Sequence, residues 1–253
     1  MRVKGVLLDL SGVLYVGDKP LPGAIEALEK LQSSGLPVRY VTNTTRRTES
    51  MINADLQNMG FNVESDHVFT VSAATKKYLQ QHELRPHLLI HPNLVSEYAD
   101  IDRSDPNVVV LGDAEDAFCY QNLNQAFRLL MEGASLLAMG NNRYFKLPDG
   151  LHLDIGPFVA ALEYASGVQA HVLGKPSRDF FLQAVSSLGC QPKETLMVGD
   201  DVVSDVQGAI ASGLQGVLVK TGKYRQGDEK ALDENTPVLD DLSAVVEWIL
   251  QHT

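Results

Sequence analysis

The chain has 253 residues, of which 44% are hydrophobic and 21% are charged, and its formal net charge is −11. This composition excludes a disordered chain and is enough for one large domain or two modest ones. The acidic balance argues against nucleic acid or an anionic membrane surface as the main partner.

The two cysteines, Cys119 and Cys190, show no metal-ligand spacing and cannot build a disulfide framework. They fit a reducing compartment. The apolar segment at residues 6–10 contains Asp9 and is too short for a signal peptide or a membrane span. We therefore expect a soluble, cytoplasmic protein.

The first third of the chain alternates between short apolar runs and helical patterns. Strands are predicted at 3–10, 37–41 and 67–70, and helices at 25–31, 48–59 and 73–81, the last with Ser72 as N-cap. This alternation predicts an α/β fold with a parallel sheet and right-handed crossovers. Ligands of such sheets bind at the carboxyl ends of the strands.

The middle and the end of the chain continue the pattern in two separate series. The middle has predicted strands at 87–91, 107–111 and 135–139 and helices at 121–131 and 156–165. The last part has strands at 194–198 and 216–220 and helices at 177–188, 204–211 and 242–251. We interpret residues 80–175 as a second α/β domain inserted into a first domain made of 1–79 and 176–253.

Two polar sites directly follow predicted strands in the first part of the chain. Asp9 ends the first apolar run, where a carboxylate is costly unless it is used; capping of the next turn, with Gly12 supplying the bend, explains it equally well. Thr42 and Asn43 follow the second run and have groups that can bind phosphoryl oxygens, although an ordinary turn also explains them.

Two further polar sites lie after the inserted segment. Lys175 precedes a predicted helix and could neutralise a phosphate and a carboxylate together, or be a solvated lysine. Asp200, Asp201 and Asp205 crowd the end of a predicted strand. Their mutual repulsion indicates either a hard divalent cation such as Mg²⁺ or a solvated acidic turn that caps the next helix.

In combination, Asp9, Thr42-Asn43, Lys175 and 199–205 stand in the order of the four motifs of the haloacid dehalogenase-like phosphohydrolase superfamily. The sequence resembles this superfamily over essentially its whole length. The long gap between the second and third motifs is similar to the subgroup that has a large α/β cap inserted there. Within that subgroup, the sequence resembles the phospholysine phosphohistidine inorganic pyrophosphate phosphatase group and its hydrolase-domain relatives. The similar strings lie at 9–15, 120–127, 156–165 and 221–225.

The resemblance implies a Rossmann-like parallel-sheet core, an α/β cap and a Mg²⁺-dependent phosphohydrolase for a small phosphorylated substrate. Asp9 would take the phosphoryl group, and water would then hydrolyse the acyl phosphate. The implied Mg²⁺ ligands are Asp9, Asp200 and the carbonyl of Ser11, with Asp201 and Asp205 acting through water. The residues implied in substrate binding are Asp9, Leu10, Ser11, Thr42, Asn43 and Lys175, of which Lys175 would also balance charge in catalysis.

Ser11 departs from the usual pattern of the superfamily, which has a second aspartate at this position to protonate the leaving group. A serine hydroxyl cannot replace that acid, and a positioned general acid contributes about 10²–10⁴ in rate. The phosphatase group named above shares the serine. We therefore expect substrates whose leaving groups need little help with protonation, namely pyrophosphate and phosphoramidates such as phospholysine or phosphohistidine.

Other interpretations remain open at this point. One is a protein with the phosphatase fold, little turnover and a regulatory or binding role; another is a phosphatase for small phosphoesters. In the cap, residues 141–144 and 154–156 are candidate substrate contacts, although Arg143 also fits a surface position. Exposed strands of the cap could pair across a two-fold axis, which favours a homodimer.

Overall fold

The N-terminal apolar run forms β1 (Gly5–Asp9), the strand from which the larger sheet is built, and all five of its residues are buried. It pairs in parallel with β12 (Thr195–Gly199) on one side and with β4 (Val38–Thr42) on the other. The chain thus builds one half of the sheet before the other, as in a doubly wound Rossmann-like sheet. The structure is a computed structural model that describes residues 2–147 and 150–252.

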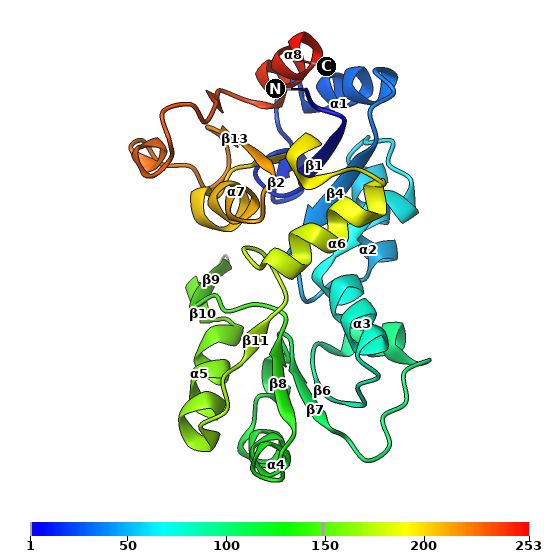
Figure 1. The fold of residues 1–253 in the computed structure, drawn as a ribbon, viewed down its shortest axis with the longest axis vertical. Coiled ribbons are helices and arrows are strands. Elements are labelled where there is room, and N and C mark those ends of the chain that lie inside the picture. Colours follow the sequence, from blue (N-terminus) through cyan, green and yellow to red (C-terminus); the bar gives the residue numbers. More distant parts are fainter. Residues whose placement is uncertain (1, 148–149, 253) are drawn as a thin grey trace. The chain divides into compact units, whose positions relative to one another are not determined.

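The chain divides into two units, Met1–Thr42 with Glu49–Phe69 and Lys175–Thr253, and Asn43–Thr48 with Thr70–Gly174. The first unit carries a six-stranded sheet in the order β14-β13-β12-β1-β4-β5 (Figure 1). Its other strands are β2 (Tyr15–Val16), β3 (Lys19–Pro20), β5 (Val68–Thr70), β13 (Gln215–Val219) and β14 (Val238–Leu239). Its helices are α1 (Ala24–Ser33), α2 (Glu49–Asn58), α6 (Arg178–Leu188), α7 (Gly208–Ala211) and α8 (Leu242–Gln251).

Helices cover both faces of this sheet. Leu28 of α1 and Val245 of α8 share one buried cluster with Val6 and Leu8 of β1. Helix α6 packs on β1 and β4, and because side chains alternate along a strand, it covers the opposite face. Burial on both faces explains why β1 is a continuous apolar run up to Asp9.

The second unit has its own four-stranded sheet, in the order β11-β8-β7-β6. Its paired strands are parallel: β6 (Pro86–Leu89), β7 (Val108–Leu111), β8 (Ser135–Ala138) and β11 (His171–Val172). Its helices are α3 (Val71–Gln81), α4 (Tyr120–Met131) and α5 (Ile155–Ser166). A hairpin of β9 (Tyr144–Leu147) and β10 (Gly150–Leu153) precedes α5.

Three local features differ from the sequence expectations. Thr70, rather than Ser72, caps α3 through a 3.0 Å bond from the Ala73 N–H, because β5 runs directly into the helix. Ser72 is instead buried and donates to Glu97. The expected helix at 204–211 begins as a π-helical segment, Val202–Gln207, a widening that is frequent at functional sites. The β9–β10 hairpin was not expected.

The units are also bounded differently from the expected domains. Residues 70–79 and 43–48, which we assigned to the core, belong to the second unit, and Lys175 belongs to the first. The reason for the first shift is packing: α3 contacts the 3₁₀ segment Pro92–Tyr98, and the Tyr98 hydroxyl donates to the Ser72 carbonyl at 3.0 Å.

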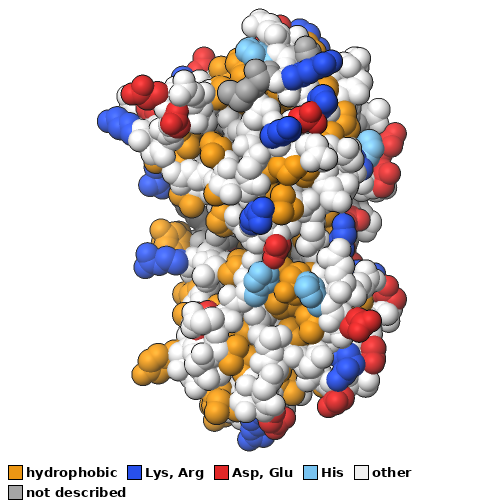
Figure 2. Space-filling model, in the orientation of Figure 1, with side chains coloured by type: hydrophobic (Ala, Val, Ile, Leu, Met, Phe, Trp, Pro, Cys, Tyr) orange, Lys and Arg blue, Asp and Glu red, His pale blue; other side chains and the backbone are white. Residues whose placement is uncertain are grey.

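The surface agrees with the composition. On the face shown in Figure 2, Lys and Arg side chains are interspersed with acidic, apolar and other side chains and do not form one extended basic patch. Among the residues that the structure describes, none of the helices is both long and apolar enough to cross a membrane.

We predict that Phe180→Ala lowers the free energy of unfolding by about 3–5 kcal/mol, because it leaves a cavity in the core. Phe180 is fully buried, and its ring meets Phe69 and Phe181 edge-on at 5.3 and 5.9 Å. The measurement is urea denaturation. The control is Ser186→Ala, an exposed position on the same helix, which should change the stability little. Equal stabilities of the two variants would contradict the packing described here.

Candidate active site

Lys175 is a buried cation held between two carboxylates from distant parts of the chain. Its Nζ lies 2.5 Å from Oδ1 of Asp9 and 2.7 Å from Oδ1 of Asp205. Lys175 is 6% exposed, Asp9 7% and Asp205 1%. Because an unpaired buried charge is strongly unfavourable, each of these three groups depends on the others for its place in the interior.

The sheet brings a third carboxylate to this ion pair. Asp9 is the last residue of β1, and Asp200 directly follows β12, the parallel neighbour of β1. Asp205 comes from the π-helical segment that follows. One carboxylate oxygen from each of Asp9, Asp200 and Asp205 lies within 4.8 Å of the others. Aligned parallel strands therefore gather these carboxylates at one edge of the sheet.

Glycines allow the main chain to approach Asp200 closely. A Cβ atom on Gly12 would lie 1.9 Å from Oδ2 of Asp200, and one on Gly222 would lie 2.0 Å from the same atom. Both glycines also have positive φ, +92° and +60°. Any other residue at either position would strain the backbone and collide with the carboxylate.

A loop after β13 holds Asp200 and the loop that follows β1. The Lys223 N–H donates to Oδ2 of Asp200 at 2.6 Å, and the Thr221 hydroxyl donates to the Gly12 carbonyl at 2.5 Å. We did not predict Thr221, Gly222 or Lys223 as site residues. The signal for them was the same as for the other motifs, since a polar residue and a glycine directly follow a buried strand.

Burial shapes the ionisation of the cluster. Burial raises the pKa of Asp9 to about 7, although the charge of Lys175 opposes this effect. Burial also raises the pKa of Asp200 to about 6, against the stabilising N–H of Lys223. For Lys175, burial lowers the pKa, but the charges of Asp205 and Asp9 outweigh it and leave the pKa raised. The lysine is therefore fully charged, and both Asp9 and Asp205 form ion pairs with it.

The cluster suits a hard divalent cation. Three buried carboxylates face a single buried ammonium, so negative charge is in excess. Carboxylate oxygens are the ligands that Mg²⁺ prefers. Asp201, in contrast, is engaged elsewhere: its Oδ1 accepts from the N–H groups of Val203 at 3.1 Å and Ser204 at 2.9 Å, capping the helical segment.

The remaining predicted residues lie around this cluster or in the second unit. Thr42 ends β4, one residue beyond Val41, which pairs with Asp9. Leu10 is buried in the core, and Ser11 is exposed. Asn43 belongs to the second unit, where its side chain lies beside Gly174. The structure thus brings together Asp9, Lys175, Asp200 and Asp205.

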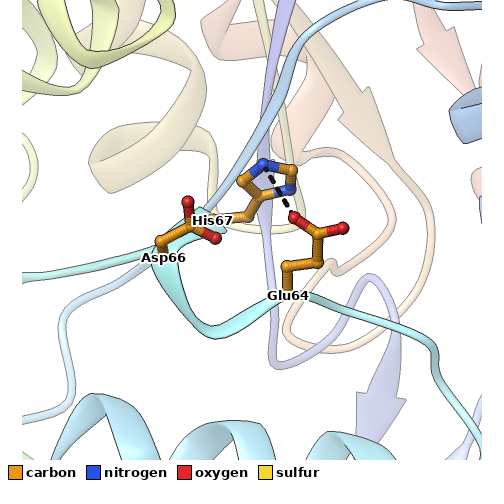
Figure 3. A group of neighbouring side chains, drawn as sticks. All are labelled: Glu64, Asp66 and His67. Atoms are coloured by element: carbon orange, nitrogen blue, oxygen red, sulfur yellow. Dashed lines mark ion pairs between the residues drawn. The ribbon is translucent and has the colours of Figure 1, made fainter.

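A second group with metal-ligand spacing, Glu64, Asp66 and His67, is a surface feature (Figure 3). Glu64 and Asp66 are exposed, and an ion pair of 3.8 Å joins His67 to Glu64. The Asp66 side chain lies on the opposite side of His67 from Glu64. The group lacks the burial that distinguishes the Asp9 cluster.

Family models match both parts of the chain. A model described as haloacid dehalogenase-like hydrolase matches residues 6–123, and one described as HAD-hydrolase-like matches residues 172–245. The first includes Asp9 and the second includes Lys175 and the three aspartates after β12. The two matches together therefore span the cluster described above.

Full-length relatives and solved structures agree with these matches. The chain is 47% identical to phospholysine phosphohistidine inorganic pyrophosphate phosphatase of Danio rerio, covering 99% of this chain and 95% of that protein. It is 46% identical to haloacid dehalogenase-like hydrolase domain-containing protein 2 of Bos taurus, covering 99% and 97%. A 4-nitrophenylphosphatase from Thermotoga maritima superposes with a TM-score of 0.89 at 26% identity, covering 98% of this chain and 97% of that one. The chain therefore belongs to the haloacid dehalogenase-like hydrolase family and is a phosphatase.

Proposed function

We propose that this phosphatase is Mg²⁺-dependent and works through an aspartyl-phosphate formed on Asp9. The observation that carries the proposal is the contact of a buried lysine with Asp9 and Asp205, next to Asp200. A buried carboxylate with a cationic neighbour is available as a nucleophile, and a nearby ammonium offsets the charge that it shares with an incoming phosphoryl group.

In the proposed reaction the residues act in two steps. A carboxylate oxygen of Asp9 bonds to phosphorus while the bond to the leaving group breaks, and water then displaces Asp9 from phosphorus to release phosphate. Lys175 orients Asp9 and balances the charge of the transferring group. Thr42 and Asn43 donate hydrogen bonds to phosphoryl oxygens, and the loop from Leu10 to Ser11 completes the phosphoryl-binding segment.

The metal would be held by Asp9, Asp200 and the carbonyl of Ser11, with Asp205 and Asp201 acting through water. When bound, it would screen the repulsion between the carboxylates and the anionic substrate. The pairing of Asp205 with Lys175 and the capping role of Asp201 support an indirect role for both.

The substrates we propose have leaving groups that need little help from the enzyme with protonation, because Ser11 stands where an acid would be required. These are pyrophosphate and phosphoramidates such as phospholysine or phosphohistidine. The name of the Danio rerio relative includes the same three compounds. The alternatives are a low-turnover protein with a regulatory or binding role, favoured by the lack of an acid at Ser11, and a phosphatase for small phosphoesters.

We further propose that unit 2 acts as the cap domain, that the protein forms a homodimer through it, and that it resides in the cytoplasm. The sheet of this unit has two edge strands, β6 and β11, and edge strands are where sheets pair across a two-fold axis. Both cysteines are free thiols, as a reducing compartment requires. Light scattering of the purified protein tests the dimer.

We predict that Asp9→Asn reduces Mg²⁺-dependent turnover by a factor on the order of 10³ or more, because it removes the nucleophile. Acid-quenched wild-type protein should carry a phosphoryl group that hydroxylamine releases, and the variant should carry none. Asp18→Asn, at an exposed position, is the matched control and should keep full activity. Turnover by Asp9→Asn at the wild-type rate would refute the proposal, and a wild type without Asp9-dependent turnover would favour the low-turnover alternative.

We predict that Ser11→Asp raises the turnover of a simple alkyl phosphate at least about tenfold, because it restores a general acid. Pyrophosphate turnover should change less. The exposure of Ser11 leaves room for the larger side chain, and Ser11→Asn controls for size without acidity. In the wild type, imidodiphosphate and pyrophosphate should be hydrolysed faster than the alkyl phosphate. The reverse order would rule out the substrate class.

We predict that the metal-free protein loses stability relative to Asp9→Asn as the pH rises from about 4 to about 7. The pKa of Asp9 in the folded state is raised to about 7, so the folded state keeps a proton that the unfolded state releases. The stabilisation is complete below pH 4 and is lost as the pH approaches 7, by at most about 1.4 kcal/mol per pH unit. Urea denaturation in EDTA measures it, and a constant difference would contradict the raised pKa.

A further inference from the structure

The second unit has a cavity of about 260 Å³, partly open to the outside, that is large enough for a small organic group. Residues 43–46 form one part of its lining, and Asp113, Asn142, Phe145 and Asp154 lie around the rest. The lining therefore combines an aromatic ring, hydroxyl and amide groups, a guanidinium and carboxylates. This mixture is typical of a site that orients a polar ligand.

Arg46 is the cation of this cavity, and its charge is already satisfied. Its Nε lies 2.5 Å from Oδ2 of Asp113, and its Nη1 lies 2.9 Å from Oε1 of Glu115. The guanidinium also lies over the ring of Phe145, with Cζ 4.6 Å from the ring centre. Asp113 is only 6% exposed, so it is fixed in this pairing. Arg46 is therefore a poor receptor for a further anion.

Asp154 is a third carboxylate near Arg46. Unlike Asp113 and Glu115, it forms no ion pair with Arg46 in the described part of the chain. Its Oδ1 accepts the N–H of Ile155 at 2.7 Å and so caps α5, and Asn142 also donates to its side chain. Burial raises the pKa of Asp154, and the negative charge of Asp113 contributes to the shift. A positive charge in the cavity would therefore stabilise the ionised form of the Asp154 carboxylate.

The charges of this cavity and its immediate partners do not balance. Among the described lining residues, the guanidinium of Arg46 stands against two carboxylates, those of Asp113 and Asp154. Outside the lining, Arg46 is also paired with Glu115, which in turn lies 3.5 Å from His91. A phosphate ion would meet this excess of negative charge and a guanidinium that is already paired. An ammonium or imidazolium group would instead meet carboxylate, amide and hydroxyl oxygens, all of which accept hydrogen bonds.

We propose that this cavity binds an organic cation, namely the amine that a phosphoramidate substrate releases. The assignment of the cation as a product rests on the proposed function. The P–N bond breaks as phosphorus is transferred to Asp9, and water then supplies its hydroxyl to phosphorus. The nitrogen takes up two protons from solvent as the P–N bond breaks, so a primary amine leaves as an ammonium ion, and the later hydrolysis returns one proton from water to solvent. Between the two substrate classes left open above, the charge of the cavity selects the phosphoramidates over pyrophosphate.

Chain connectivity supports the link between the cavity and the reaction. Residues 43–46 of the lining directly follow Thr42, the strand-end residue that we propose binds phosphoryl oxygens. Gly174, which directly precedes Lys175, lies against Asn43 within the second unit, with no room for a Cβ beside the Met139 carbonyl. The residues that follow Thr42 and the residue that precedes Lys175 thus contact each other within the second unit.

Binding to the full-length protein tests the cavity directly. We expect Nα-acetyl-lysine amide, a cation, to bind with measurable affinity in titration calorimetry, and its neutral analogue Nα-acetyl-norleucine amide to bind at least about tenfold more weakly. Asp154→Asn keeps an acceptor for the Ile155 N–H but loses the charge, and it should weaken the cation about tenfold. The control is Asp116→Asn, which removes the same charge at an exposed position and should leave the affinity unchanged. Equal binding of cation and neutral analogue, or equal effects of both variants, would overturn the proposal.

Turnover separates this proposal from the one it rests on. Asp154→Asn should lower kcat/KM for phospholysine about tenfold relative to pyrophosphate, whereas Asp116→Asn should leave that ratio unchanged. An unchanged ratio in Asp154→Asn, with turnover still lost in Asp9→Asn, would reject the cation site and leave the aspartyl-phosphate mechanism standing. Turnover of both substrates by Asp9→Asn would instead reject the proposed function. Melting temperatures of the variants must match that of the wild type, and a variant that fails this check is replaced by Asp154→Ser.

Discussion

The contact of Lys175 with Asp9 and Asp205 is the constraint on which the first unit depends. It joins Asp9, at the end of the first strand, to Lys175, which lies 166 residues later in the chain, and both residues are buried. A buried ion pair contributes little net stability, because desolvation of the charges offsets their attraction, yet loss of one partner is strongly destabilising. Such an arrangement is a poor choice for stability alone. A buried ion pair of this kind is expected where the carboxylate takes part in a reaction. The raised pKa of Asp9 shows that burial disfavours its ionised form.

The carboxylates are oriented mainly by the backbone. Gly12 and Gly222 approach Oδ2 of Asp200 from two loops, and the Lys223 N–H occupies the same oxygen. Gly199 leaves room for Asp205, since a Cβ there would lie 2.3 Å from the Cβ of Asp205. Because main-chain groups have less freedom than side chains, a site held in this way loses little entropy when it binds a cation or a phosphoryl group.

The sequence predicted the residues that a parallel sheet positions by its topology alone. Asp9, Thr42 and Asp200 could be found because each ends or directly follows a buried apolar run, and strand ends of this kind share one edge. Asp201 looked equivalent to Asp200, but its role as a helix cap depends on the turn that follows and not on the strand. The β9–β10 hairpin carried a signal, because Phe145-Lys146-Leu147 and Leu151-His152-Leu153 alternate between apolar and polar residues, but each run is short. The Thr221 loop also carried one, a threonine and a glycine after a buried strand, but its contact with Asp200 is made by the Lys223 N–H, which a pattern of side chains does not show. Ser72 was misassigned because Thr70, in the preceding strand, reaches the same helix start.

Two observations from different units favour the same leaving group, and neither depends on how the units are arranged. In the first unit, Ser11 cannot donate a proton, which suits a leaving atom basic enough to take its proton from solvent. In the second unit, the cavity at Asp154 has an excess of carboxylates, which favours a group that is positively charged once protonated. A phosphoramidate nitrogen satisfies both requirements. A phosphate leaving group also tolerates Ser11, because it leaves as a stable anion without a proton, but the carboxylates of the cavity repel it. The oxygen of an alkyl ester suits neither site, since it is weakly basic, needs a proton to leave, and leaves as a neutral alcohol. Ser11 alone is compatible with both pyrophosphate and phosphoramidates, and the charge of the cavity favours the phosphoramidates.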